Sequence, residues 1–338
     1  MTRDPKRGAP RATPHSSLLP PHTAPYQAPL WLPGGHAQTI YPVLFAPRPR
    51  VTYRRERWTT PDGDFVDVDW ADGADRDAPL VALFHGLEGS SRSHYAVSLM
   101  RAVIDDAGWR GAVVHFRGCS GEPNRLVRAY HSGDSAEIDW MVRRLAQSAT
   151  TLYVAGVSLG ANALLRWLGE TGNEATRVVA RAAAVSAPLD LMAAGNALDR
   201  GFNLLYTRHF LTTMRRKAIA KLARHPDAYE RAAVARTRTL REFDDLVTAP
   251  LHGYRDTDDY WTRASSKPVL RHIAVPTLLI NARNDPFMPQ EALPMAHEVS
   301  SAVTLEQPAE GGHVGFVSGP FPGRLTWLPS RLLDHFRH

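Results

Sequence analysis

The stretch that decides the fold runs from Leu152 to Leu168 and reads LYVAGVSLGANALLRWL. Its first residues form a short apolar run typical of a buried strand, and residues 161–168 have the apolar spacing of a helix. Between them lies Gly156-Val157-Ser158-Leu159-Gly160, a G-x-S-x-G sequence. A sharp strand-to-helix turn needs small residues two before and two after the serine, because larger side chains would collide with the strand and the helix. The stretch therefore predicts a nucleophile elbow that exposes the Ser158 hydroxyl; an ordinary glycine-rich turn is the alternative.

Strands and helices are predicted to alternate along most of the chain. Continuous apolar runs, which suit strands buried on both faces, occur at 80–84, 112–116, 152–155, 182–185, 277–280 and 303–305. Helix-compatible stretches occur at 95–106, 135–145 and 159–168. This alternation predicts an α/β fold of the α/β-hydrolase type, with a mostly parallel central sheet flanked by helices.

A long Arg-rich segment, 190–265, interrupts the alternation. It has no buried-strand run, and its apolar residues recur at helical spacing, so we expect a helical cap inserted over the sheet edge that binds ligands. Residues 1–30 hold seven prolines and no apolar periodicity, which predicts a flexible Pro-rich tail. The expected organisation is therefore the tail 1–30, a core in two parts, 31–189 and 266–338, and the cap 190–265.

The cysteine content and the apolar runs of the sequence indicate where in the cell the protein is expected. The single cysteine, Cys119, excludes an internal disulfide and fits a reducing compartment. No apolar run approaches the length of about 18 residues that a membrane helix needs, and no apolar region follows the basic N-terminus as in a signal peptide. A cytoplasmic location is therefore expected.

The chain of 338 residues carries a formal net charge of +6, which leaves an anionic partner open. Part of this charge is a basic cluster in the cap: Arg208, Arg215, Arg216, Lys217, Lys221 and Arg224. A solvated helix face is the simplest interpretation, with weak attraction to an anionic membrane surface as a second one. No nucleic-acid-binding motif occurs, so nucleic acid is not an expected partner. The sequence leaves the oligomeric state open.

A serine nucleophile needs a general base, and that base needs an acid to orient it. In this strand–elbow–helix architecture the chain order is serine, acid and histidine, each placed just beyond a strand. The run 277–280 leads into Asp285, and the run 303–305 leads into the glycine-flanked His313. Asp190 is the alternative acid, although its position also suits the N-cap of a helix. We predict Ser158 as the nucleophile, His313 as the base and Asp285 as the acid.

The tetrahedral intermediate needs two backbone N–H donors, one after the nucleophile and one from a loop after an earlier strand. Leu159 supplies the first, and Leu87 is expected to supply the second, with His85 bracing its loop. Cys119 follows another strand without an elbow around it, so we interpret it as a small buried residue rather than a nucleophile. No phosphate-binding loop, dinucleotide motif or metal-ligand spacing occurs, so neither a cofactor nor a metal is expected.

Several blocks together resemble the YheT-like branch of the α/β-hydrolases, which includes the abhydrolase-domain lipases of eukaryotes. The resemblance runs from about residue 30 to the C-terminus. The blocks are WLPGGHAQTI (31–40), HGLEG (85–89), FRGCSGEPN (116–124), YHSG (130–133), the elbow at Ser158, NARNDPF (281–287) and GGHVGF (311–316).

This resemblance implies a serine esterase (EC 3.1.1) that acts on short- to medium-chain acyl esters or acylglycerols, with Ser158, Asp285 and His313 at the triad positions. The family often reads DDPF where this chain has Asn284-Asp285-Pro286-Phe287, which leaves the acid itself in place. A thioesterase, amidase or acyltransferase would use the same triad, and a non-catalytic lipid-binding module is a further alternative. The GGHAQTI block has no role that the sequence reveals.

Overall fold

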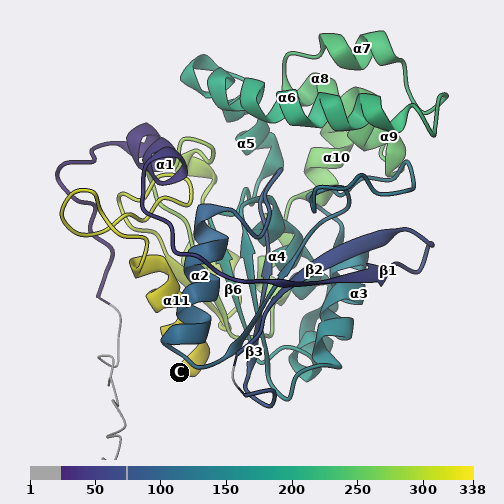
Figure 1. Ribbon diagram of the computed structural model, residues 1–338. Coiled ribbons are helices and arrows are strands. Elements are labelled where there is room, and N and C mark those ends of the chain that lie inside the picture. Colours follow the sequence, from purple (N-terminus) through teal and green to yellow (C-terminus); the bar gives the residue numbers. More distant parts are fainter. Residues whose placement is uncertain (1–23, 74) are drawn as a thin grey trace, which may run out of the picture.

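The computed structural model describes residues 24–73 and 75–338. Its centre is an eight-stranded sheet in the order β1-β2-β4-β3-β5-β6-β7-β8 (Figure 1). The strands from β4 to β8 are parallel, whereas β1 and β2 are antiparallel to their neighbours. The bounds are β1 Arg54–Thr59, β2 Phe65–Ala71, β3 Leu80–Phe84, β4 Arg110–Val114, β5 Leu152–Val157, β6 Arg181–Val185, β7 Thr277–Ile280 and β8 Val303–Glu306. The predicted fold class is confirmed.

Helices cover both faces of the sheet (Figure 1). One face packs against α2 (His94–Asp105) and α11 (Trp327–Arg337), and the other against α3 (Ser135–Ala146) and α4 (Leu159–Thr171). In β3, Val81 and Leu83 join the first cluster, while the residues on either side of them join the second. Because successive side chains of a strand point to opposite faces, a strand covered on both faces is apolar throughout.

The first two strands were not predicted, and pairing of buried charges explains why. The β2 sequence includes Asp67 and Asp69, which are both buried. Each forms a two-pronged ion pair with an arginine of β1: Arg57 Nε lies 2.8 Å from Asp67, and Arg55 Nε lies 2.7 Å from Asp69. The charged residues of β1 and β2 interrupt the apolar pattern by which a strand is recognised in the sequence. In the structure these charges pair with each other across the two strands.

Between β6 and β7 a layer of helices lies over the carboxyl ends of the strands (Figure 1); we call residues 191–264 the helical layer. Its helices are α5 Leu191–Leu198, α6 Leu204–Lys221, α7 Arg231–Arg236, α8 Leu240–Phe243, α9 Ala249–Leu251 and α10 Thr257–Ala264. The layer has an apolar cluster of its own. Polar contacts join it to the core: Asn162 of α4 donates to the Ala264 carbonyl at 2.9 Å, and the Tyr260 hydroxyl accepts from Ser132 N at 2.9 Å.

Most of the expected N-terminal tail, residues 1–23, lies outside the described residues. The segment from residue 24 onward packs on the core, where the Tyr26 side chain is buried and its hydroxyl donates to the Val317 carbonyl at 2.8 Å. The segment leads into α1 (Gly35–Leu44), which lies near the loops after β7 and β8. Within residues 24–73 and 75–338, the helices are too short or too polar to span a membrane.

Candidate active site

Ser158 lies at the sharp turn between β5 and α4 and has a positive φ of 52°. Two glycines allow this turn. A Cβ on Gly156 would lie 2.6 Å from Ala161 Cα, and a Cβ on Gly160 would lie 2.4 Å from the Phe84 carbonyl oxygen. Neither position can hold a side chain, which is the physical reason for the G-x-S-x-G pattern of a nucleophile elbow.

The structure brings the three predicted site residues together. His313 Nε2 lies 2.9 Å from Ser158 Oγ, and His313 Nδ1 lies 2.8 Å from Asp285 Oδ2. The Asp285 side chain is buried, and its other oxygen accepts from Phe287 N at 2.8 Å. A carboxylate only accepts, so Nδ1 carries the proton and Nε2 is left to accept from the serine hydroxyl. This is the arrangement that a nucleophile, a base and an orienting acid require.

The alternative acid, Asp190, has a different place. It is the N-cap of α5, where its carboxylate accepts from Ala193 N at 3.0 Å. A capping carboxylate satisfies one of the free amides at a helix start, as the sequence position of Asp190 suggested.

Two backbone amides beside Ser158 are available to a ligand. The loop after β3 passes so close that a Cβ on Gly86 would lie 3.1 Å from Ser158 Cβ. In this loop Gly86 N donates to the Tyr95 hydroxyl and Glu88 N donates to the Tyr130 hydroxyl, both at 2.9 Å. Within the described part of the chain, the amides of Leu87 and of Leu159, the first residue of α4, have no acceptor.

His85 braces the loop that carries Leu87. The Phe116 amide donates to His85 Nε2 at 3.1 Å, so the ring proton is on Nδ1, which donates to the Gly86 carbonyl at 2.7 Å. Burial lowers the pKa of His85 to about 3, so the ring stays neutral. The loop is thereby tied to the end of β4 before any substrate enters.

The GGHAQTI block, whose role the sequence did not reveal, forms α1 and holds the loops of the acid and the histidine. Gln38 Oε1 accepts from Asn284 Nδ2 and from Gly311 N, both at 2.9 Å. Asn284 Oδ1 in turn accepts from Gly312 N at 2.9 Å. One buried amide side chain therefore links the residue before Asp285 to the loop before His313.

Thr39, the next residue of the block, holds the backbone of His313 itself. Its hydroxyl accepts from His313 N at 2.8 Å and donates to the Gly35 carbonyl at 2.7 Å. The fit is close, since a Cβ on Gly315 would lie 2.2 Å from the Gln38 carbonyl oxygen. The only sequence signal for these contacts is the adjacent polar pair Gln38-Thr39, which follows His36 in the same block.

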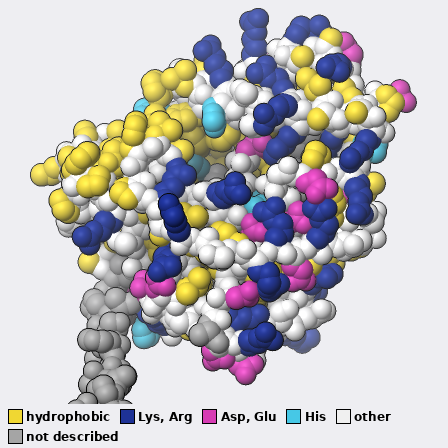
Figure 2. All heavy atoms as spheres, in the orientation of Figure 1, with side chains coloured by type: hydrophobic (Ala, Val, Ile, Leu, Met, Phe, Trp, Pro, Cys, Tyr) yellow, Lys and Arg dark blue, Asp and Glu magenta, His cyan; other side chains and the backbone are white. Residues whose placement is uncertain are grey.

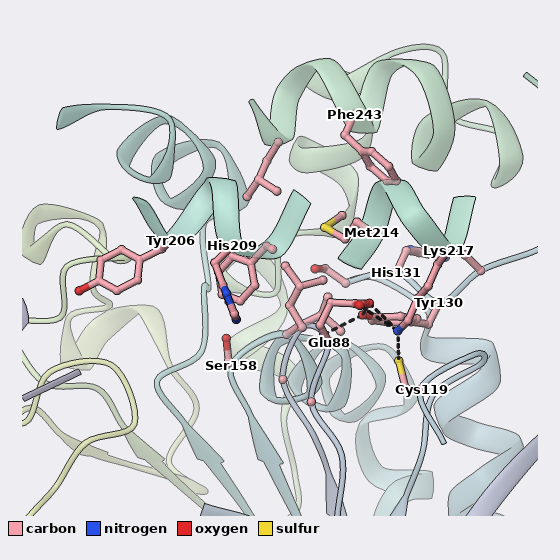
Figure 3. A pocket seen from close by; sticks show the side chains of 18 of the residues that line it. Glu88, Cys119, Tyr130, His131, Ser158, Tyr206, His209, Met214, Lys217 and Phe243 are labelled. Atoms are coloured by element: carbon pink, nitrogen blue, oxygen red, sulfur yellow. Dashed lines mark hydrogen bonds and ion pairs between the residues drawn. The ribbon is translucent and has the colours of Figure 1, made fainter. Parts of the chain in front are cut away.

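Ser158 and His313 line a cavity of about 1080 Å³ between the core and the helical layer (Figure 3). The core loops form its floor, and α6 crosses above it. Its walls are mostly apolar, as is usual for sites that bind small molecules. In the described parts of the chain, no group of three His, Cys, Asp or Glu side chains could hold a metal ion.

The profile of the alpha/beta hydrolase fold family matches residues 79–320 of the sequence. The chain belongs to the α/β-hydrolase fold family. It is 41% identical to YheT of Escherichia coli K12 over 306 residues, which are 88% of this chain and 89% of that protein. The predicted resemblance to the YheT-like branch is thus confirmed.

Further relatives of this α/β-hydrolase include the human phospholipase ABHD3, 30% identical over 90% of this chain and 77% of that protein. Among solved structures, the esterase Pf2001 of Pyrococcus furiosus has the same fold, with a TM-score of 0.53 and 18% identity over 86% of this chain and 98% of that chain. The protein is accordingly an α/β-hydrolase of the esterase and lipase type.

In this α/β-hydrolase the basic cluster expected on the cap surface is divided. Lys217 and Lys221, one helical turn apart on α6, line the cavity, and Arg216 lines it too. Arg215 donates to the Thr237 carbonyl at 3.0 Å, whereas Arg208 is exposed. The charge run therefore serves the cavity as well as the surface.

Cys119 also lines the cavity, where its sulfur lies 3.5 Å from Lys217 Nζ. Burial raises the pKa of this thiol to about 11, and a protonated thiol is a poor nucleophile. The prediction of a small buried residue agrees with this environment.

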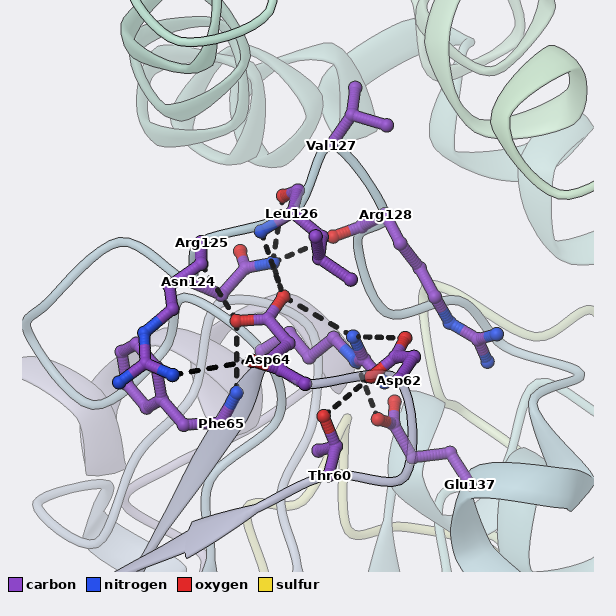
Figure 4. A network of polar contacts seen from close by, with 12 residues as sticks. Thr60, Asp62, Asp64, Phe65, Asn124, Arg125, Leu126, Val127, Arg128 and Glu137 are labelled. Atoms are coloured by element: carbon purple, nitrogen blue, oxygen red, sulfur yellow. Dashed lines mark hydrogen bonds and ion pairs between the residues drawn. The ribbon is translucent and has the colours of Figure 1, made fainter.

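Beneath this end of the cavity a polar network fixes the loop after β4 (Figure 4). Arg117 is buried and forms ion pairs with Asp64 and Glu137 at 3.2 and 2.6 Å. The Asp64 carboxylate also accepts from Asn124 Nδ2 at 2.7 Å and from three backbone amides. Burial acts to raise the pKa of Asp64, but these hydrogen bonds outweigh it and lower the pKa. The FRGCSGEPN block thus builds a rigid cavity floor.

Exposed apolar side chains surround one end of the cavity, which we call the lip. They are Val43, Leu44 and Phe45, at the end of α1, and Phe202 and Leu205, at the start of α6, each 46–66% exposed. Figure 2 shows hydrophobic side chains gathered over α1. Four of the five also line the cavity, so the lip is continuous with the site. The two stretches of chain that carry the lip residues, 24–55 and 200–224, contain no acidic residue.

Proposed function

We propose that this α/β-hydrolase is a serine esterase that cleaves short- to medium-chain acyl esters or acylglycerols through an acyl-enzyme. The proposal is carried by one observation: hydrogen bonds of 2.9 and 2.8 Å connect Ser158, His313 and Asp285 at the wall of an apolar cavity. The phospholipase activity in the name of a relative, ABHD3, supports an acyl ester as the substrate class.

In the first half-reaction Ser158 Oγ attacks the ester carbonyl carbon while His313 Nε2 takes the hydroxyl proton. The carbonyl oxygen becomes an oxyanion that accepts from the free amides of Leu87 and Leu159, and the start of α4 favours the negative charge. Collapse of the intermediate breaks the bond to the alcohol oxygen, which takes the proton from His313 and leaves. The acyl group stays on Ser158.

In the second half-reaction His313 takes a proton from water, and the resulting hydroxide attacks the acyl carbon. Collapse returns the proton to Ser158 Oγ and releases the carboxylic acid. Asp285 stays ionised throughout and stabilises the imidazolium through Nδ1. Because the acid, the histidine and the two amides are already held by other residues, little reorganisation is needed during the reaction.

The test is Ser158→Ala, assayed with 4-nitrophenyl esters and with a fluorophosphonate label. We expect esterase activity to fall by at least about 10⁴-fold, and labelling to disappear, with unchanged circular dichroism. The matched control is Cys119→Ala, which removes the rival nucleophile and should still take up the label. A folded Ser158→Ala protein that keeps its activity or its label would overturn the proposal. Turnover of matched ester, thioester and anilide substrates separates an esterase from a thioesterase or amidase.

We further propose that the enzyme meets its substrate at an anionic lipid surface through the lip rather than through the basic cluster. The lip residues expose apolar surface that a bilayer interface would cover. Arg48, whose guanidinium donates to the Val43 carbonyl, and Arg92 line the same cavity and would meet anionic headgroups. An ester lifted out of the surface at the lip would enter the cavity beside Ser158.

A further inference from the structure

The inner side of α6 changes character along its length (Figure 3). Its cavity-lining residues include, in order, Tyr206, His209, Phe210, Met214, Arg216, Lys217 and Lys221. His209 lies above Ser158, whereas Lys217 lies at the far side beside Cys119 and Tyr130 (Figure 3). With a rise of 1.5 Å per residue, the levels of His209 and Lys217 are about 12 Å apart along the helix axis. The cavity thus has an apolar part near the serine and a cationic end remote from it.

The two lysines of the cationic end differ in their partners. Lys217 Nζ lies 2.8 Å from Glu88 Oε2, so its charge is matched by a carboxylate. Lys221 Nζ donates to the carbonyls of Val127 and Arg128 at 3.0 and 2.7 Å. These carbonyls belong to the loop that Asp64 anchors, so the Lys221 ammonium is held in place at the cavity wall (Figure 4).

The carboxylates of the cavity wall are engaged elsewhere. Glu88 pairs with Lys217, Glu122 pairs with Arg57 at 2.7 Å, and Asp244 accepts from Thr248 and Trp261. Asp64, beneath the loop, already accepts from Arg117, Asn124 and three backbone amides. Among residues 24–73 and 75–338, the half-buried Lys221 ammonium has only carbonyl partners. Such an ammonium is a strong site for an anion, because an anion restores the stabilisation lost on leaving water.

The pKa values of the two lysines agree with this difference in partners, a carboxylate for Lys217 and carbonyls for Lys221. Burial lowers the pKa of Lys221 to about 8. Burial also acts to lower the pKa of Lys217, but the neighbouring Cys119 and Glu88 outweigh it, and its pKa lies above the ordinary value. A bound anion would favour the charged form of Lys221 in the way that Glu88 favours that of Lys217.

We propose that the Lys221–Lys217 end of the cavity is a subsite for an anionic group of the substrate, a carboxylate or a phosphate, remote from the scissile ester. The inference rests on the proposed function and adds a substrate class to it: acyl esters that carry a negative charge several bonds from the reacting carbonyl. Lys221 is the main anchor and Lys217 supplies further donors.

The test uses two pairs of esters that differ by one anionic group. On the acyl side, the 4-nitrophenyl monoester of octanedioic acid is compared with 4-nitrophenyl octanoate. On the alcohol side, 1-octanoylglycerol 3-phosphate is compared with 1-octanoylglycerol. For each pair the quantity is the ratio of kcat/KM for the anionic ester to that for the neutral ester. In the wild-type enzyme we expect a ratio above one for at least one pair, which identifies the side of the ester that carries the charge.

The variant is Lys221→Met, which we expect to lower this ratio at least tenfold, mainly through KM. Lys221→Arg should keep most of the ratio, and Arg208→Met, which removes a cation from the exposed side of α6, should leave it unchanged. Ratios of one or below for both pairs in the wild type, or equal effects of Lys221→Met and Arg208→Met, would overturn the inference. If neutral esters are still hydrolysed through Ser158, such a result leaves the proposed function standing, whereas an active Ser158→Ala enzyme removes both.

Discussion

The two sides of the cavity are built in different ways. On the core side the candidate catalytic groups lie at the ends of buried strands and are held by short hydrogen bonds, as in the Ser158–His313–Asp285 series. On the side of the helical layer, α6 presents long or aromatic side chains that are only partly buried, among them Met214 and Lys217. On the core side, the positions of the functional groups are thus fixed by the backbone. On the layer side, the shape and polarity of the cavity wall depend on which side chains α6 carries.

This difference indicates a division of labour. Substitutions on the core side should change kcat, because they move groups that act on the reacting atoms. Substitutions on the layer side should change which ester is bound, because they alter contacts that are the same in the ground state and the transition state. Variants on one side at a time can therefore test this division.

The largest effect is expected on the core side, from Asp285→Asn. An asparagine would favour the wrong tautomer of His313, so kcat should fall by about 10⁴-fold while KM changes little. The matched control is Asp190→Asn, which alters an N-cap and should lower stability by at most about 1 kcal/mol, with activity retained. Steady-state kinetics and thermal melting distinguish the two. Equal losses of kcat in both variants would contradict the choice of acid.

An intermediate effect is expected from Gln38→Leu in α1. The substitution removes the acceptor of Asn284 Nδ2 and Gly311 N, so the loops of the acid and the histidine lose a common anchor. Two buried donors left without a partner should lower the free energy of unfolding by about 1–3 kcal/mol. Displacement of His313 should lower kcat about tenfold, with KM nearly unchanged.

Two readouts identify Gln38 as a positioning residue. The rate of fluorophosphonate labelling should fall together with kcat, and the pH dependence of labelling should shift, since both report on His313. Gln147→Leu, at an exposed position, is the control and should change neither. A Gln38→Leu enzyme that loses stability but labels at the wild-type rate would show that α1 only supports the fold.

The smallest effect is expected at the lip, from Leu205→Asp on the layer side. Leu205 is about half exposed, so its contact with a lipid surface would contribute roughly half of a leucine's transfer free energy, about 1 kcal/mol. An aspartate removes this contribution, so binding to anionic vesicles should weaken about fivefold. Hydrolysis of a short water-soluble ester should not change its kcat. Met295→Asp, which is 63% exposed and lies outside the lip, is the control. Equal vesicle binding by both variants would contradict the proposal that the lip binds a lipid surface.

Much of the fold could be predicted because strands covered on both faces are continuously apolar, as β3 and β5 are. The strands β1 and β2 could not, since their charges are satisfied only by each other. The strand predicted over 112–116 spans Arg110–Val114, a difference at its ends only. The division into tail, core and cap stays a prediction.

For the candidate site, strand ends predicted which three residues meet, and their catalytic roles stay a prediction. The sequence could not predict the contacts of Gln38 and Thr39, because their partners are more than 240 residues away along the chain. Nor could it show that Lys217 and Lys221 face inward. Helical spacing places residues on a common side, but only packing decides what that side faces.

The contact between Thr39 and His313 joins residues 274 positions apart, almost the two ends of the described chain. Loops of this length close late, after local helices and neighbouring strands have formed. We therefore expect a ribosome-bound chain that has not yet released its last segment to form the serine turn before the histidine loop contacts α1. During refolding, the recovery of ellipticity should precede the recovery of esterase turnover, so that catalysis itself reports the final step of assembly.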